Sequence, residues 1–66
     1  MSVAKVVEIT AESKESFDDA IKRGIARANK TLKNVRGAWV AEQKVEVDGG
    51  QISAYRVNLR VSFILE

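Results

Sequence analysis

Residues 35–65 read VRGAWVAEQKVEVDGGQISAYRVNLRVSFIL, and apolar and polar side chains alternate along both halves of this run. A period of two is the pattern of a β-strand that buries one face. Asp48, Gly49 and Gly50 separate the halves, and the two glycines supply the positive-φ residues that a tight hairpin turn requires. The run therefore predicts two antiparallel strands, 35–48 and 51–65.

The alternation also predicts which side chains share a face. In 51–65 the buried face consists of the odd-numbered apolar residues, namely Tyr55, Val57, Leu59, Val61, Phe63 and Leu65. A strict period of two in 35–48 groups Val35, Gly37, Trp39, Ala41, Val45 and Val47 in the same way. It leaves Ala38 and Val40 on the opposite face of the sheet.

Upstream of the hairpin, the sequence predicts one strand and one helix. Residues 3–10 are rich in β-branched side chains, which favours a strand with Val3, Val7 and Ile9 on one face. Further on, the apolar positions recur every three or four residues, which predicts a helix buried along one side. They are Phe17, Ala20, Ile21, Gly24, Ile25, Ala28 and Leu32. Ser13 is a favourable N-cap residue, so we expect the helix to begin there.

The order of elements is β-α-β-β, and the fold class is α+β, with a three-stranded antiparallel sheet wrapped around one helix. No proline, linker or repeat divides residues 1–66, so they form a single domain. A strand over 51–65 would measure about 45 Å, whereas a compact chain of this size is only about 28 Å across. The hairpin therefore either overhangs its own subunit or bends strongly. Overhanging strands and open edges favour association with further copies.

Composition restricts the function. The chain has no Cys and no His, and its net charge is +2. Disulfides, thiol or imidazole catalysis and soft-ligand metal sites are therefore excluded, and we expect no enzyme. No segment is apolar enough to span a bilayer, and no signal segment opens the chain, so we expect a soluble cytoplasmic protein without a membrane partner. The net charge does not favour nucleic acid as a partner.

Two groups of side chains could still bind a ligand. A tryptophan at the position of Trp39 is more often interface core than a ligand platform. Trp39 nevertheless offers a flat π-surface for an aromatic ligand, and Arg56 could meet an anionic or carbonyl-bearing part of it. Five cations lie opposite the apolar stripe of the helix and span about 140° of its circumference. They are Lys22, Arg23, Arg27, Lys30 and Lys33. They could follow a row of phosphates or simply keep the helix solvated, and a steep salt dependence of binding would separate the two interpretations.

Several sequence segments, spread over essentially the whole chain, resemble the dodecin family. The matching segments are Lys5 to Ile9, the helix start from Ser13 to Ser16 with the Phe17 to Ile21 that follows, Lys30 to Val35, and Tyr55 to Phe63. The resemblance implies twelve copies closed into a hollow sphere of cubic symmetry. It also implies storage of a small ligand without turnover, since many members bind flavins in pairs.

Two positions depart from the flavin-binding pattern of the family. Gly37 stands where flavin-binding members carry Trp, and Arg56 stands where they carry Gln. Gly37 and Trp39 share strand parity, so Trp39 could reach the same pocket from about 7 Å further along the strand. This predicts a flavin site, for FMN or riboflavin, formed by Trp39, Arg56, Gln43 and Gly37.

The alternative is a dodecin-like shell that is structural or binds a cation instead of flavin. The oxygen ligands of Glu42, Glu46 and Asp48 suit a hard cation such as calcium. Such an ion would lie where carboxylates of several copies converge on a symmetry axis. A dodecin-like protein without any cofactor also remains open.

Overall fold

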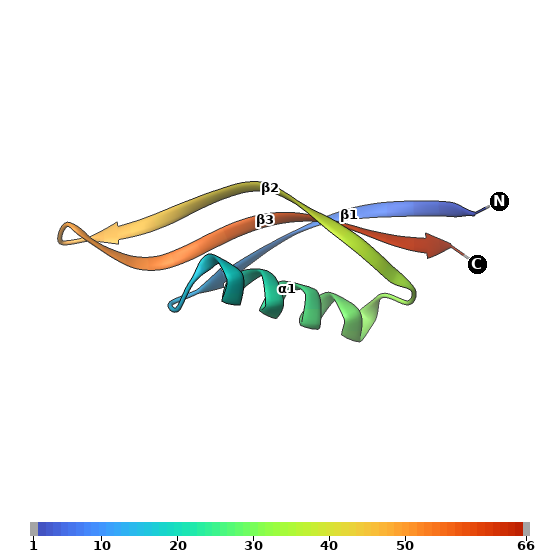
Figure 1. The fold of residues 1–66 in the computed structure, drawn as a ribbon, viewed down its shortest axis with the longest axis horizontal. Helices are drawn as coiled ribbons and strands as arrows, with labels where there is room; N and C mark the ends of the chain where they lie inside the picture. The colour runs from blue at the N-terminus through green and yellow to red at the C-terminus, as the bar shows by residue number, and fades with distance from the viewer. Residues whose placement is uncertain (1, 66) are drawn as a thin grey trace.

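The computed structural model describes residues 2–65 and contains four elements in the expected order (Figure 1). They are β1 (Val3–Ser13), α1 (Phe17–Thr31), β2 (Val35–Asp48) and β3 (Gln51–Leu65). The strands form one antiparallel sheet in the order β1-β3-β2, and α1 lies across one face of it. The predicted β-α-β-β fold is confirmed. Within residues 2–65, no helix has the length and apolar character needed to cross a membrane.

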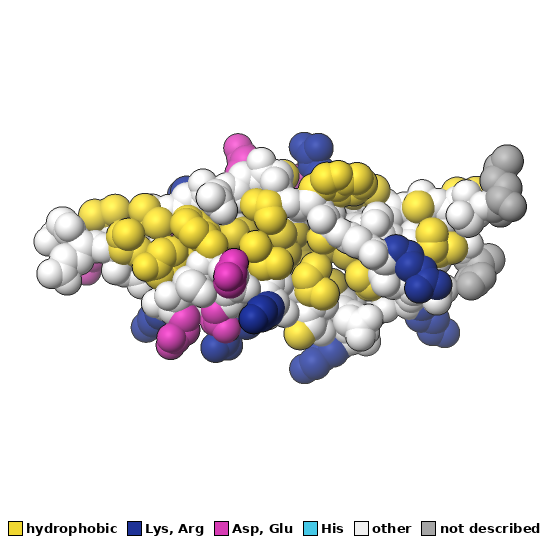
Figure 2. Space-filling model, in the orientation of Figure 1, with side chains coloured by type: hydrophobic (Ala, Val, Ile, Leu, Met, Phe, Trp, Pro, Cys, Tyr) yellow, Lys and Arg dark blue, Asp and Glu magenta, His cyan; other side chains and the backbone are white. Residues whose placement is uncertain are grey.

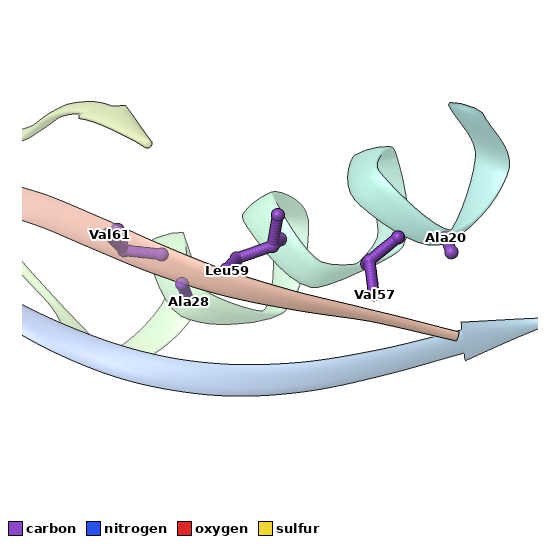
Figure 3. Packing of buried hydrophobic residues seen from close by; sticks show 5 residues of the cluster. All are labelled: Ala20, Ala28, Val57, Leu59 and Val61. Carbon is purple, nitrogen blue, oxygen red and sulfur yellow. The ribbon is translucent and has the colours of Figure 1, made fainter. Parts of the chain in front are cut away.

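The core forms where α1 packs on β1 and β3 (Figure 3). Val57, Leu59 and Val61 are fully buried and lie against Ala20 and Ala28 of the helix. The odd-numbered face of β3 is therefore the helix face, as its alternation predicts. Gly24 brings the helix close, because a Cβ atom added there would lie 2.9 Å from Leu59 Cδ1 and 3.1 Å from Ala11 Cβ.

The helix begins later than expected, and the prediction that Ser13 caps it is wrong. β1 continues through Ser13, whose Cα pairs with that of Tyr55, so the backbone stays extended. The N-cap is Ser16, which accepts a hydrogen bond from the Asp19 amide at 3.0 Å. The buried Ser13 hydroxyl accepts from the Glu15 amide and donates to Asp19 Oδ2 at 2.6 Å. Both serines therefore organise the turn, but only Ser16 caps the helix.

Two bulges in β2 overturn the expected faces of this strand. Arg36 and Ala41 are extra residues, since Val35 and Gly37 pair with Phe63 and Ser62, and Val40 and Glu42 pair with Leu59 and Asn58. Each bulge reverses the side-chain alternation. Ala38 and Val40 consequently share the helix face with their partners Val61 and Leu59, and the prediction that they lie on the second face is wrong. Gly37 and Trp39 lie there instead.

The hairpin of β2 and β3 runs past the N-terminal end of α1, at the left of Figure 1. The molecule measures 51 × 19 × 14 Å, and its radius of gyration of 13.5 Å exceeds the roughly 11 Å of a compact chain of this length. Val47 and Ile52 on this arm are 62% and 53% exposed. The predicted overhang is thus present, and it carries apolar surface.

Candidate functional site

The face of the sheet that α1 does not cover, called the open face below, collects most of the candidate residues. Directly opposed residues of an antiparallel sheet share a face, so the register groups the side chains into cross-strand rows. From the chain-terminal end toward the hairpin, the rows are Val6–Ser62–Gly37, Glu8–Arg60–Trp39, Thr10–Asn58–Glu42 and Glu12–Arg56–Lys44. Each row takes one residue from β1, β3 and β2 in turn.

Trp39 is the exposed aromatic residue of this face. Its side chain is 59% exposed, and Arg60 lies between it and Glu8. The Arg60 guanidinium approaches Glu8 only to 3.8 Å, so its charge is weakly engaged. A hollow of ≈ 450 Å³ adjoins the pair and is lined by Val6, Trp39, Val40, Ala41 and Arg60. The arrangement offers a flat π-surface beside a solvent-accessible cation.

Arg56 is held by carboxylates of the neighbouring strands. Its guanidinium donates to Glu12 at 2.7 Å and lies 3.5 Å from Glu46. The hydrogen bond to Glu12, followed by the charges of Glu12 and Glu46, raises the pKa of Arg56 above its usual value. Within one chain Arg56 is therefore an ion-pair centre of the sheet, with its donors partly occupied.

The row next to Arg56 is linked by hydrogen bonds across all three strands. Thr10 Oγ1 donates to Asn58 Oδ1 at 2.9 Å, and Asn58 Nδ2 donates to Glu42 Oε1 at 3.0 Å. Together with the Arg56 row, it lines a polar depression of ≈ 310 Å³. The open face thus divides into an aromatic half around Trp39 and a polar half around Arg56.

The predicted flavin-site residues are brought together only in part. Gly37 lies one row from Trp39 on the open face, and a Cβ atom there would meet only Ser62 Oγ, at 3.6 Å. Arg60 is the partner of Trp39, and Arg56 lies four residues from Arg60 on β3. The two arginines are therefore about 13 Å apart along the strand. Gln43 borders the polar depression, but it pairs with Val57 and so has the parity of the helix face.

Arg60 is the residue that sequence reasoning missed. A bulge-free alternation groups Trp39 with the core-facing residues and gives no reason to pair it with an arginine. The bulge at Arg36 removes that obstacle, because it turns Gly37 and Trp39 toward the even-numbered residues of β3. No signal in the sequence marks this bulge.

The three predicted metal ligands do not converge within one chain. Glu42 accepts from Asn58, Glu46 lies near Arg56 and Lys44, and Asp48 is the last residue of β2 before the hairpin turn. Over the part of the chain that the structure describes, no three Asp or Glu side chains form a group able to hold a metal ion. A cation site built from these residues would require further copies.

The sequence profile of the family described as Dodecin matches residues 3–66. The chain belongs to the dodecin family. This dodecin is 38% identical over 63 residues to the calcium dodecin of Mycobacterium tuberculosis, with 96% of this chain and 89% of that protein covered. It is 36% identical over 64 residues to the dodecin of Thermus thermophilus, with 97% and 93% covered.

Solved dodecins share the fold closely. The dodecin of Streptomyces davaonensis matches with a TM-score of 0.93 at 35% identity, covering 98% of this chain and 96% of that one. The structure of the calcium-chelating Mycobacterium tuberculosis dodecin, described with a novel calcium-binding site, matches with a TM-score of 0.84 at 38% identity and covers 98% and 93%. The elongated β-α-β-β subunit is therefore the dodecin fold.

Proposed function

We propose that this dodecin is a non-enzymatic, cytoplasmic homododecameric shell that sequesters a small aromatic ligand. The observation that supports this most directly is the exposure of Trp39 on the open face, beside Arg60. The indole can stack on a planar ligand, and the guanidinium can meet an anionic or carbonyl group of it. Riboflavin and FMN are the ligands to test, because their isoalloxazine ring is planar and FMN adds a phosphate.

The exposed apolar surface supports assembly. Val3 and Leu65 near the chain ends are 60% and 47% exposed, and Val47 and Ile52 expose a similar share on the hairpin arm. β1 and β2 are both open edges of the sheet, and proteins usually cover such edges by pairing or contact. One open face also provides only one wall for a planar ligand. A second copy would provide the other, so assembly and binding depend on one surface.

The departures at Gly37 and Arg56 change the shape of the proposed site. Gly37 has no side chain, and a Cβ atom there would meet only Ser62 Oγ, at 3.6 Å. Trp39 places the stacking surface one row nearer the hairpin than a tryptophan at position 37 would. Arg60 becomes the nearest cation to the stacked ring, while Arg56 is held by Glu12 and Glu46. Quenching of flavin fluorescence would depend on Trp39 in this site.

Titration of riboflavin and FMN while flavin fluorescence is recorded tests the proposal. We expect quenching by the unaltered protein, its loss in Trp39→Ala and partial retention in Trp39→Phe, which preserves a smaller ring. Native mass spectrometry of each variant reports whether the subunit number has changed, so that lost binding is not confused with lost assembly. Quenching that is equal in Trp39→Ala would refute Trp39 as the stacking residue, and a monomer would refute the shell.

The similarity to the calcium dodecin of Mycobacterium tuberculosis supports a second candidate, a calcium-binding shell. Its ligands would come from Glu42, Glu46 or Asp48 of several copies around a symmetry axis. A ligand that binds only the folded state raises the unfolding temperature. A rise with calcium that Glu42→Gln abolishes, without a rise with FMN, would favour this candidate. A rise with FMN alone would favour the flavin shell.

A further inference from the structure

The positive charges of this dodecin are segregated along the chain. Residues 20–41 contain six of the eleven Lys and Arg residues and none of the nine Asp and Glu residues. The rest of the chain contains the other five Lys and Arg residues and all nine Asp and Glu residues, so it is acidic. The net charge of +2 for the whole chain hides this division. This segment includes most of α1 and the first half of β2.

Most of these cations form one surface on α1 and the turn after it. We call it the basic helix face, and it consists of Lys22, Arg23, Arg27, Lys30 and Lys33. All five residues are exposed. In Figure 2 the acidic side chains along the helix gather toward its N-terminal end, whereas Lys and Arg continue beyond them along its length. The face is separate from the open face, which lies on the other side of the sheet.

The basic helix face differs from the open face in how its charges are compensated. On the open face, Lys44, Arg56 and Arg60 each lie within ion-pair distance of a glutamate. On the basic helix face, Arg23 pairs with Asp19 at 2.6 Å, and no other cation of the face has an ion-pair partner among residues 2–65. The four cations other than Arg23 are thus available to an external anion.

Helix stability accounts for Arg23, through its i,i+4 pair with Asp19, and for Lys30, but not for the other cations of the face. Cations stabilise a helix dipole only within the last turn, where Lys30 lies, whereas Lys22 lies in the first half of α1. A surface that serves only solubility mixes both signs of charge, and this one has a single sign over residues 20–41. Lys22 and Lys30 are eight residues apart, so the row of cations extends about 12 Å along the helix.

We propose that the basic helix face binds linear inorganic polyphosphate. A row of Lys and Arg side chains matches a chain of phosphate groups, since ammonium and guanidinium groups both donate to phosphate oxygens. Proteins that hold single-stranded nucleic acid add aromatic side chains on which bases stack. The exposed residues of α1 include no aromatic residue, which favours a phosphate chain without bases. In a shell, each subunit would repeat the face, and a long chain could bind several copies at once.

Binding of polyphosphate, measured over a series of salt concentrations, tests this inference independently of the flavin proposal. The test variant is Arg27→Gln with Lys30→Gln, and the matched control is Lys5→Gln with Lys14→Gln. Both pairs remove two exposed cations that have no ion-pair partner among residues 2–65, and the control cations lie outside the basic helix face. In single-stranded nucleic acid each phosphate contact contributes about 0.7 to the slope of log affinity against log salt, and we expect a similar contribution for polyphosphate.

The test variant loses two contacts, so we expect its slope of log affinity against log salt to become shallower by about 1.4 and its affinity at low salt to fall roughly tenfold. The control variant should keep both the slope and the affinity of the unaltered protein. Trp39→Ala should bind polyphosphate normally, which separates this site from the flavin site. Equal losses in the test and control variants would overturn the proposal. So would absence of binding at low salt, or tighter, base-dependent binding of a single-stranded oligonucleotide with the same number of phosphates.

Discussion

Trp39 lies directly opposite Arg60 on the face of the sheet that the helix leaves uncovered, and Glu8 lies on the other side of Arg60. The indole of Trp39 is exposed, and the neighbouring Arg60 guanidinium is 3.8 Å from the Glu8 carboxylate, so this ion pair is weak. In the same chain, Arg56 is bound by Glu12 at 2.7 Å. A ligand stacked on Trp39 would therefore encounter Arg60 before Arg56.

Arg60→Gln should weaken FMN binding more than riboflavin binding, because only FMN carries a phosphate that the guanidinium can attract. The extra loss should be at most about fivefold, since exposed ion pairs contribute up to about 1 kcal/mol. Titration of both flavins into Arg60→Gln measures the difference. Lys14→Gln makes the same change of charge in the turn after β1 and should leave the ratio unaltered. Equal weakening of both flavins by Arg60→Gln would mean that Arg60 does not face the phosphate.

Gly24→Ala should destabilise the fold. Its Cβ atom would lie 2.9 Å from Leu59 Cδ1, and Leu59 is fully buried. Overpacking of a core costs about 1–3 kcal/mol, and the better helix propensity of alanine offsets about 1 kcal/mol of this. We expect a net loss of about 1 kcal/mol in urea unfolding. Gly37→Ala is the control, because its Cβ atom would meet only Ser62 Oγ at 3.6 Å; if both variants unfold alike, the close contact at Gly24 is unimportant.

Ser16→Ala should lower the free energy of unfolding by about 1 kcal/mol, because it removes the side-chain acceptor for the Asp19 amide at the helix N-terminus. Ser16→Asn supplies an alternative acceptor and should retain most of the stability. Urea unfolding, monitored by circular dichroism at the helix band, measures both. A Ser16→Ala protein as stable as the unaltered one would show that Ser16 is dispensable as the cap.

Asp19 should make stability depend on pH in the acidic range. The hydrogen bond from Ser13, followed by that from Arg23, lowers the pKa of Asp19 below its ordinary value of 3.8. A carboxylate with a lowered folded-state pKa contributes stability above the unfolded-state pKa, and this is lost as pH falls through the folded-state pKa. The loss should therefore occur below about pH 4.

Urea midpoints between about pH 6 and pH 2.5 measure this contribution. We expect Asp19→Asn to be less stable than the unaltered protein at pH 6 and to lose less stability on acidification. Asp18→Asn removes the neighbouring exposed carboxylate, which accepts no hydrogen bond from Ser13 or Arg23, and serves as the matched control. An identical acid profile in Asp19→Asn would exclude Asp19 as its source.

The sequence predicted the elements well and the site less well. The bounds of both hairpin strands follow from the period of two. The core face of β3 follows from its unbroken alternation, and three residues of that face, Val57, Leu59 and Val61, are fully buried. The start of α1 was predicted at Ser13, because either serine is chemically able to cap. Pairing of Ser13 with Tyr55 keeps it in the strand and leaves the cap to Ser16.

Local periodicity alone determined that this chain forms β-α-β-β and that its hairpin is too long for one helix to cover, because period and strand length are properties of neighbouring residues. Only the tertiary structure decided which side chains meet. The bulges at Arg36 and Ala41 depend on β3 as a partner, and they turn Trp39 toward Arg60 and Ala38 and Val40 toward the helix. Strand pairing also separates Trp39 from Arg56 and distributes Glu42 and Glu46 among different polar partners. A bulge forms between two strands far apart in sequence, so the pattern within either strand does not reveal it.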